Sequence, residues 1–173
     1  MEFLLIRLER KFANLKENSK KALVAYLVAG DPDMSSTLEL MNQFVLSGVD
    51  IIELGVPFTD PIAEGPIIQA AHDRALQANT SLDMIFSLVE EFRTKDSETP
   101  IVLMGYINTF LANSKALESI HERGTDAVLI VDVPGESSLE DIGIQNKNIA
   151  SISLISPTTD NNRIQKICMS SSG

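Results

Sequence analysis

Short apolar runs that alternate with amphipathic segments restrict the fold of this chain more than any other feature. Because buried strands joined to helices by short loops form parallel sheets with right-handed crossovers, this alternation predicts an α/β fold. No linker, repeat or shift in composition divides the sequence, so we expect residues 1–173 to form a single domain. The runs with strand character cover residues 22–28, 49–54, 100–104, 127–131 and 151–155.

Helical periodicity and capping residues predict what separates these runs. Apolar residues recur at helical spacing over residues 2–18. Ser35 and Ser36 are suited to cap the next helix, and Ser81 is suited to cap a later one. Further helices are expected over residues 66–78, 82–92, 114–123 and 160–167.

Two architectures fit five parallel strands: an open doubly wound sheet and a (β/α) barrel. The turn after the first run, Ala29-Gly-Asp-Pro32, lacks the G-x-G-x-x-G loop that would favour a Rossmann sheet. Polar residues follow each strand, as in a barrel, whose active sites lie at the carboxyl ends of its strands. A closed eight-stranded barrel needs at least about 200 residues. We therefore expect the TIM (β/α)8 barrel family, here as about five to six βα units of an incomplete barrel.

Composition and charge exclude several classes of protein. The formal net charge is −10, and the basic residues between 7 and 21 are interleaved with Glu9 and Glu17, which indicates a solvated helix face and not a nucleic-acid surface. No apolar run approaches the roughly 20 residues of a membrane-spanning helix. Cys168 is the single cysteine, and neither a disulfide nor a metal site is expected. Residues 1–12 do not resemble a signal peptide, so we expect a cytoplasmic protein.

Two glutamates are the strongest candidates for chemistry. Glu53 ends a buried apolar run, where a carboxylate is costly unless it is paired or functional. Glu64 follows in a loop with three prolines, at residues 57–66. Two carboxylates over one face of a sheet can divide acid and base duties, although a structural carboxylate at Glu53 and a merely solvated acid at Glu64 are the alternatives.

Other polar residues have ordinary structural explanations beside functional ones. Asp60 can form an Asx turn before Pro61, and Asp132 can terminate a strand. Tyr106 can line a pocket or pack at the rim of the sheet. Both histidines, His72 and His121, lie in predicted helices and are interpreted as surface or capping residues.

One long motif identifies a family. The segment Ile52-Glu-Leu-Gly-Val-Pro-Phe-Thr-Asp-Pro-Ile-Ala-Glu-Gly-Pro-Ile-Ile-Gln69 closely resembles the signature of the tryptophan synthase alpha chain family. Four shorter segments match the family in the same order along the chain: Ala29–Pro32, Leu103–Asn108, Val131–Pro134 and Ser156–Thr159. The resemblance therefore covers nearly the whole sequence.

The resemblance implies a TIM barrel that cleaves indole-3-glycerol phosphate by a retro-aldol reaction in tryptophan biosynthesis. The products are indole and glyceraldehyde 3-phosphate. Indole passes to a beta subunit, which holds pyridoxal phosphate and joins indole to serine, within a heterotetramer of two alpha and two beta subunits. No cofactor is expected in the alpha chain.

The resemblance also implies roles for individual residues. Glu53 corresponds to the acid/base at the indole ring and the glycerol hydroxyl, and Glu64 to the acid that accepts the indole N–H. Pro57 and Asp60 lie in the loop that packs against the beta subunit. The implied indole pocket is lined by Tyr26, Met104, Tyr106, Val131 and Ile155.

Two departures from the family pattern shape the expectations. Most members have Asp where this chain has Glu64. The sequence stops at Gly173, where the family continues into a sixth strand, and the phosphate-binding glycine loops belong to later units. We therefore expect a truncated alpha chain of the lyase family. The alternatives are a catalytically incomplete module that only binds the beta subunit and, less favoured, another phosphate-binding barrel lyase.

Overall fold

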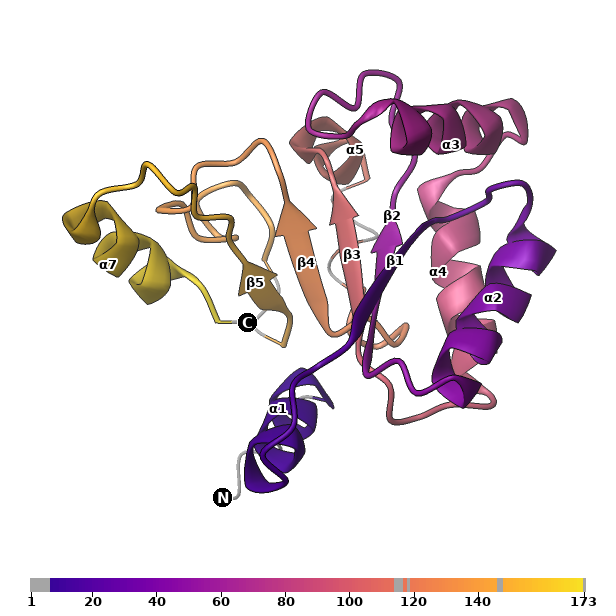
Figure 1. The fold of residues 1–173 in the computed structure, drawn as a ribbon. Coiled ribbons are helices and arrows are strands. Elements are labelled where there is room, and N and C mark those ends of the chain that lie inside the picture. The colour runs from indigo at the N-terminus through magenta and orange to yellow at the C-terminus, as the bar shows by residue number, and fades with distance from the viewer. Residues whose placement is uncertain (1–6, 114–116, 118, 146–147, 173) are drawn as a thin grey trace.

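The computed structural model describes residues 7–113, 117, 119–145 and 148–172. Strands and helices alternate along the chain as the sequence predicts (Figure 1). None of the described helices is long and apolar enough to cross a membrane. The elements are α1 (Arg7–Glu17), β1 (Val24–Val28), α2 (Met34–Leu46), β2 (Ile51–Gly55), α3 (Pro66–Gln77), α4 (Leu82–Arg93), β3 (Ile101–Gly105), α5 (Ile107–Leu111), β4 (Ala127–Ile130), β5 (Ala150–Ile152) and α7 (Asn161–Ser170).

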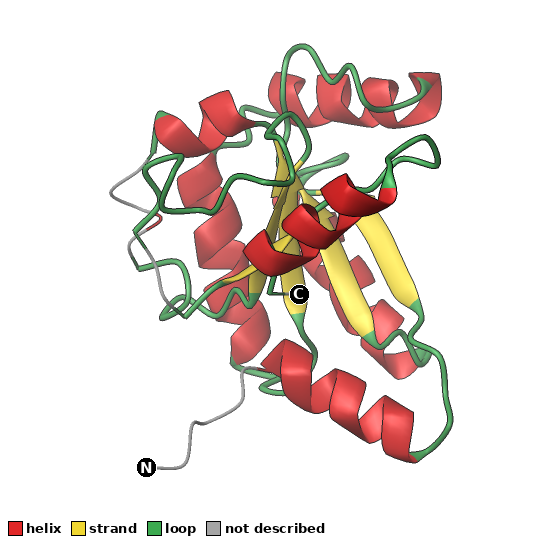
Figure 2. Ribbon diagram, turned by 90° about the vertical axis from the view of Figure 1, so that its left-hand side faces the viewer, coloured by secondary structure: helices red, strands yellow, loops and turns green. Residues whose placement is uncertain are grey.

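The five strands form one parallel sheet in the order β1-β2-β3-β4-β5. Each new strand is added on the same side of the previous one. A doubly wound sheet instead reverses its direction of growth at a switch point, so the consecutive order excludes that alternative. The arrangement is that of a TIM barrel wall, and Figure 2, seen from the side of β5 and α7, shows its twist.

Side chains alternate between the two faces of the sheet along each strand, and each face packs in a different cluster. On β2, Ile52 and Leu54 point to the outer face, where the apolar sides of α2 and α4 cover them. The opposite face is the inner face, which carries Ile51, Met104 and Leu129. Leu8 of α1 joins this inner cluster, so α1 lies across the amino ends of the strands. Figure 1 shows α1 at that end and α3 and α5 at the carboxyl ends.

Helix boundaries follow local capping chemistry, with one correction. Ser81 caps α4 by accepting a hydrogen bond from the Met84 amide, as predicted. The prediction that Ser35 and Ser36 cap α2 is wrong. Asp33 is the cap, and its carboxylate accepts hydrogen bonds from the Ser36 amide and from the Ser35 hydroxyl. A carboxylate at this position also interacts favourably with the positive end of the helix dipole.

The helix predicted over residues 114–123 is only partly within the described residues, since 114–116 and 118 lie outside them. Residues 119–124 form turns, and Leu117 is helical. A short helix that the sequence did not predict, α5, begins directly after β3. Asp132, in the loop after β4, accepts a hydrogen bond from the Ile107 amide at 2.8 Å and so stabilises the first turn of α5.

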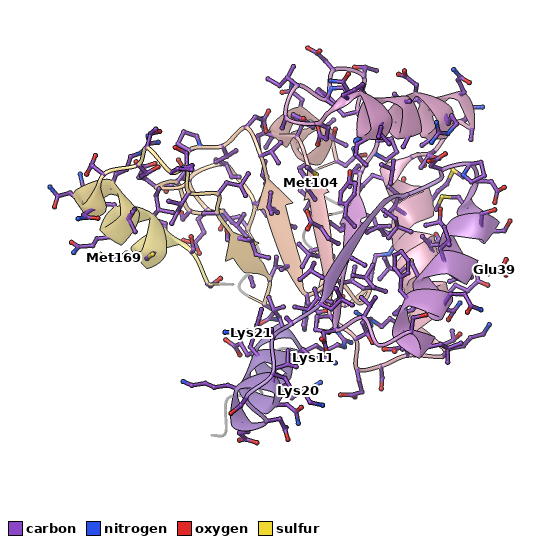
Figure 3. All side chains as sticks on the ribbon, viewed as in Figure 1. Lys11, Lys20, Lys21, Glu39, Met104 and Met169 are labelled. Atoms are coloured by element: carbon purple, nitrogen blue, oxygen red, sulfur yellow. The ribbon has the colours of Figure 1, made fainter. Side chains whose placement is uncertain are left out.

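The basic residues around α1 are not all solvated, which corrects a second expectation. Arg7 donates to the carboxylate of Asp126 at 2.9 Å, and Asp126 is fully buried. The same carboxylate accepts from Arg93 and from the Ile101 amide, both at 2.9 Å. This buried cluster, Arg7–Arg93–Asp126, fixes α1 to the sheet. Figure 3 shows Lys11, Lys20 and Lys21 gathered around α1, at the end of the sheet opposite to Met104.

Candidate active site

Strand alternation places Glu53 on the inner face of the sheet. Its neighbours on β2, Ile52 and Leu54, point to the outer face, so Glu53 shares the inner face with Ile51. In the register of the sheet, Glu53 lies beside Tyr26 of β1 on one side and Val102 of β3 on the other. The carboxylate therefore lies near the carboxyl end of the sheet, next to a phenol and an apolar side chain.

The loop between β2 and α3, residues 56–65, brings the second carboxylate to the same end. The Tyr106 hydroxyl, directly after β3, donates a short hydrogen bond to Glu64 Oε2. The same hydroxyl oxygen accepts from the Ala63 amide at 2.9 Å. Tyr106 is almost completely buried, so this contact anchors the loop over the sheet. The second carboxylate oxygen, Glu64 Oε1, is buried and has no hydrogen-bond partner in the described residues.

Burial and nearby charges shift the pKa values of Glu53 and of the two tyrosines beside it. Burial raises the pKa of Glu53 above its usual range. The pKa of Tyr26 is raised strongly, by burial first and then by the charges of Glu64 and Glu53. Burial and the hydrogen bond to Glu64 raise the pKa of Tyr106 to about 12. Both phenols are therefore neutral hydrogen-bond donors at neutral pH, while Glu53 is poised to hold a proton more readily than a solvated carboxyl.

Helix α3 holds the Glu64 loop from the other side. Gln69 donates to the backbone carbonyl of Glu64 at 2.9 Å. His72 accepts a hydrogen bond from the Phe58 amide at 3.0 Å, and its ring is fully buried. The interpretation of His72 as a surface or capping residue is thus wrong. The i, i+3 spacing of Gln69 and His72, which puts them on one helix face, is the signal that could have revealed this role.

The residues of the expected indole pocket are only partly brought together. Tyr26, Met104 and Val131 belong to one cluster on the inner face, at the carboxyl end of the sheet. Tyr106 follows Met104 by two residues, directly after β3, and its hydroxyl contacts the Glu64 loop. Ile155 lies beyond the end of β5, is 43% exposed and is not a member of that cluster.

The two residues expected to face a partner differ in exposure. Pro57 is buried and shapes the loop from within, whereas Asp60 is exposed. Ile62 in the same loop and Ile67 in the first turn of α3 are 75% and 82% exposed. Where exposed apolar side chains form a contiguous patch, they mark a binding surface. In the described part of the chain, no group of three or more His, Cys, Asp or Glu side chains is arranged to hold a metal ion.

The geometry defines the class of protein. A parallel sheet that grows strand by strand, with its polar residues at the carboxyl ends of the strands, is the wall of a TIM barrel enzyme. Two carboxylates and two neutral phenols beside an apolar inner face are suited to proton transfer on a largely apolar substrate.

Comparisons with known proteins identify the family. The model of the family described as tryptophan synthase alpha chain matches residues 12–173. The tryptophan synthase alpha chain of Nitrosospira multiformis is 43% identical over 96% of this chain. That of Acinetobacter baylyi is 42% identical over the same share. This chain belongs to the tryptophan synthase alpha chain family.

Solved structures agree with that family. The alpha subunit from Legionella pneumophila matches 98% of this chain and 66% of its own length, with a TM-score of 0.91 and 39% sequence identity. The tryptophan synthase complex from Pyrococcus furiosus matches 88% of this chain and 63% of its own, with a TM-score of 0.80 and 38% identity. The chain spans about six tenths of the length of the curated relatives it matches, 61% and 64% for the two named above.

Proposed function

We propose that this chain carries the catalytic carboxylates of a tryptophan synthase alpha subunit, a lyase that cleaves indole-3-glycerol phosphate into indole and glyceraldehyde 3-phosphate. One observation carries the proposal. Glu53 comes from β2, beside Tyr26, and Glu64 comes from a separate loop that the Tyr106 hydroxyl holds just beyond β3, so both carboxylates lie at the carboxyl end of the sheet. Family membership agrees with this reaction class.

Glu53 is assigned the proton transfers. Cleavage of the carbon–carbon bond needs a proton added to the ring carbon that carries the glycerol chain and a proton removed from the adjacent hydroxyl. The electron pair of the broken bond then returns to the indole ring, and the hydroxyl carbon becomes the aldehyde. The raised pKa of Glu53 favours a carboxyl that delivers one proton and takes up the other near neutral pH.

Glu64 is assigned the indole nitrogen. Its Oε2 is occupied by the Tyr106 hydroxyl, whereas Oε1 is buried and free of partners in the described residues. A buried carboxylate oxygen without a donor is costly, and an indole N–H supplies the missing donor. The bond stabilises the positive charge that develops on the ring when its carbon is protonated. Tyr26, Met104, Tyr106 and Val131 are proposed to line the pocket, with Ile155 at its edge.

The partner is proposed to be the beta subunit, which would hold the pyridoxal phosphate in a cytoplasmic heterotetramer. The supporting observation is the loop that carries the exposed Asp60 and Ile62, followed by the exposed Ile67 in the first turn of α3. Pro57 is proposed to hold the loop in shape beneath that surface. We also propose that residues 1–173 act as one domain, since one sheet organises the described residues.

Indole release from indole-3-glycerol phosphate tests the proposal. The chain would be assayed with and without a beta subunit, beside its Glu53→Gln variant and a complete alpha subunit from a relative. A rate of indole release that is at least about 100-fold lower in Glu53→Gln than in the wild type supports the assignment, since acid–base catalysis contributes about 100-fold or more.

Equal release by Glu53→Gln would overturn the role of Glu53. If this chain is silent while the complete subunit is active, the proposed activity fails for the chain. Binding to the beta subunit would then favour the second candidate, a partner-binding module. The exposed Ile62 and Ile67 support this candidate.

A further inference from the structure

We propose that His72 is a positioning residue that fixes the Glu64 loop by accepting a hydrogen bond from the Phe58 amide. The inference rests on the proposed function, because it assigns His72 to the placement of a proposed catalytic carboxylate. His72 lies on α3, outside the segment expected to carry chemistry, and its imidazole does not contact Glu64 through a hydrogen bond in the described structure.

His72 Nδ1 lies 3.0 Å from the Phe58 backbone nitrogen, a normal hydrogen-bond length. The ring is fully buried, so water does not replace this bond when it is lost. Phe58 is the third residue after β2. The bond therefore holds the loop at the point where it leaves the strand.

The Phe58 ring and Tyr106 connect this hydrogen bond to the carboxylate of Glu64. The Phe58 ring stacks on the Tyr106 ring, with centroids 4.7 Å apart and an interplanar angle of 19°. The hydroxyl of Tyr106 in turn donates to Glu64 Oε2 and accepts from the Ala63 amide. Moving the Phe58 backbone thus disturbs the ring whose hydroxyl orients Glu64.

The hydrogen bond from Phe58 requires one protonation state of the His72 ring. Because the Phe58 amide donates, Nδ1 must be unprotonated, and the neutral ring carries its proton on Nε2. Nε2 lies 3.5 Å from the Tyr26 hydroxyl, and so faces the inner-face phenol. One imidazole thereby lies between the Glu64 loop and the β1 residue that neighbours Glu53.

Charges around the ring act in opposite directions. Burial lowers the pKa of His72, while Glu64 from the loop and Asp73 from α3 raise it. The Tyr26 hydroxyl is the polar group that faces the ring from β1. Since burial is the largest cause, His72 stays neutral at neutral pH, and the bond to Phe58 is lost only as the pH falls and Nδ1 gains a proton.

Three substitutions separate the two ring nitrogens. His72→Asn places an amide oxygen near the position of Nδ1 and keeps an acceptor for the Phe58 amide. His72→Gln reaches instead toward the position of Nε2 and loses that acceptor. His72→Leu loses both polar groups while retaining most of the apolar volume. Each variant would be made in the 173-residue chain, and His121→Gln would assign the two histidine signals by NMR.

The readouts do not depend on activity. We expect the nitrogen spectrum to show His72 with the proton on Nε2. Exchange of the Phe58 amide should rise about fivefold in the Leu and Gln variants, the factor for a hydrogen bond of about 1 kcal/mol, and stay near the wild-type rate in Asn. Amide exchange in β3 is the internal reference, because general destabilisation would accelerate it equally. The carboxyl carbon signal of Glu64 should shift in the Leu variant and return in Asn.

A proton on Nδ1, unchanged Phe58 exchange in the Leu variant, or an unmoved Glu64 signal would overturn the inference. Indole binding by the wild-type chain, measured by calorimetry, separates this result from the proposed function. If indole does not bind while the NMR results are as expected, the proposed substrate site fails and the positioning role of His72 stands.

Discussion

At the scale of single residues, the environment of Glu53 follows from its place on β2. The alternation of the strand turns this carboxyl toward the inner face, where Tyr26 and Val102 flank it and solvent reaches it only in part. The resulting rise in pKa has a consequence for stability as well as for chemistry. The folded state holds the Glu53 proton more tightly than the unfolded state, whose pKa is near 4.5.

Glu53→Gln should therefore change the pH dependence of stability. When the pKa of a carboxyl is raised by folding, ionisation costs stability as the pH rises above the unfolded pKa. At pH 7 the Gln variant should resist urea at least as well as the wild type, and the gain should vanish below about pH 4.5. Urea unfolding at both pH values measures this difference. A variant that is less stable than the wild type only at pH 7 would contradict the cause assigned to the shift.

Gly55, two residues after Glu53, lies against the phenol of Tyr26, which leaves no room for a side chain. A Cβ at this position would overlap the Tyr26 hydroxyl, which passes directly over the glycine. Gly55→Ala should therefore cost about 1–3 kcal/mol of unfolding free energy, the usual range for overpacking. Chemical denaturation measures the loss. In a Tyr26→Leu background the same substitution should cost less, and an equal cost there would rule out the proposed clash.

At the scale of elements, α1 is joined to the sheet by a buried ion pair cluster. Asp126 is fully buried and accepts from both Arg7 and Arg93, and burial lowers the pKa of Arg93 to about 10. Arg93 also donates to the carbonyls of Gly124 and Thr99, so its charge is surrounded by acceptors. The cluster lies at the amino ends of the strands, where a barrel typically places residues that serve stability.

Asp126→Ala should destabilise the fold by about 3–5 kcal/mol, because it removes the buried carboxylate that pairs with both Arg93 and Arg7 and leaves Arg93 only the longer contact to Asp96, at 3.7 Å. The matched control is Glu98→Gln, which removes the exposed partner of Arg10 in an ion pair of 3.6 Å. Exposed pairs contribute about 0–1 kcal/mol, so this control should change little. Urea titration followed by circular dichroism compares the two. Equal effects would show that burial does not decide the strength of these pairs.

At the scale of the whole molecule, the described sheet has a protected centre and two open edges. All residues of β3 are buried, whereas β1 is exposed at its start and β5 has only one buried residue. Strands at the edge of a sheet have one row of backbone groups without strand partners. The inner face is open between β1 and β5 in the described residues, although a closed barrel would join such edges.

Amide hydrogen exchange should follow this gradient. We expect β3 amides to exchange at least about tenfold more slowly than those of β1 and β5, because local opening is easiest where contacts are fewest. Exchange followed by NMR at a fixed pH provides the test, with the exposed loop residues Thr59 and Asp60 as the fast reference. Edges as well protected as β3 would show that another strand pairs with them in solution.

The order of the elements was predictable because it depends on local patterns. Apolar runs bounded by turn residues marked all five strands to within a few residues, and Ser81 was found from its capping chemistry. Glu53 stood out because a carboxylate at the end of a buried run is unusual. The segment around Glu64 was recognised from its motif. Each of these signals is contained in a few neighbouring residues.

His72 and Arg7 could not be found in the same way. Apart from its i, i+3 spacing to Gln69, nothing near His72 in the sequence distinguishes it from a helix surface residue, and its partner Phe58 lies fourteen residues earlier. Arg7 lies 119 residues from Asp126. For Ile155 the local pattern was misleading. The apolar run predicted that it belongs to a strand, but it lies beyond the end of β5 and is 43% exposed.

The sequence by itself therefore determined the succession of strands and helices, the family and the candidate carboxylates, because periodicity, capping and motif depend on short-range chemistry. The tertiary structure decided the consecutive strand order, the burial of His72 and Asp126, and the meeting of Glu64 with Tyr106. These features depend on which distant segments pack together, and burial then sets whether a charge is paired and whether a histidine is neutral. A residue becomes part of a site only when the fold supplies its neighbours.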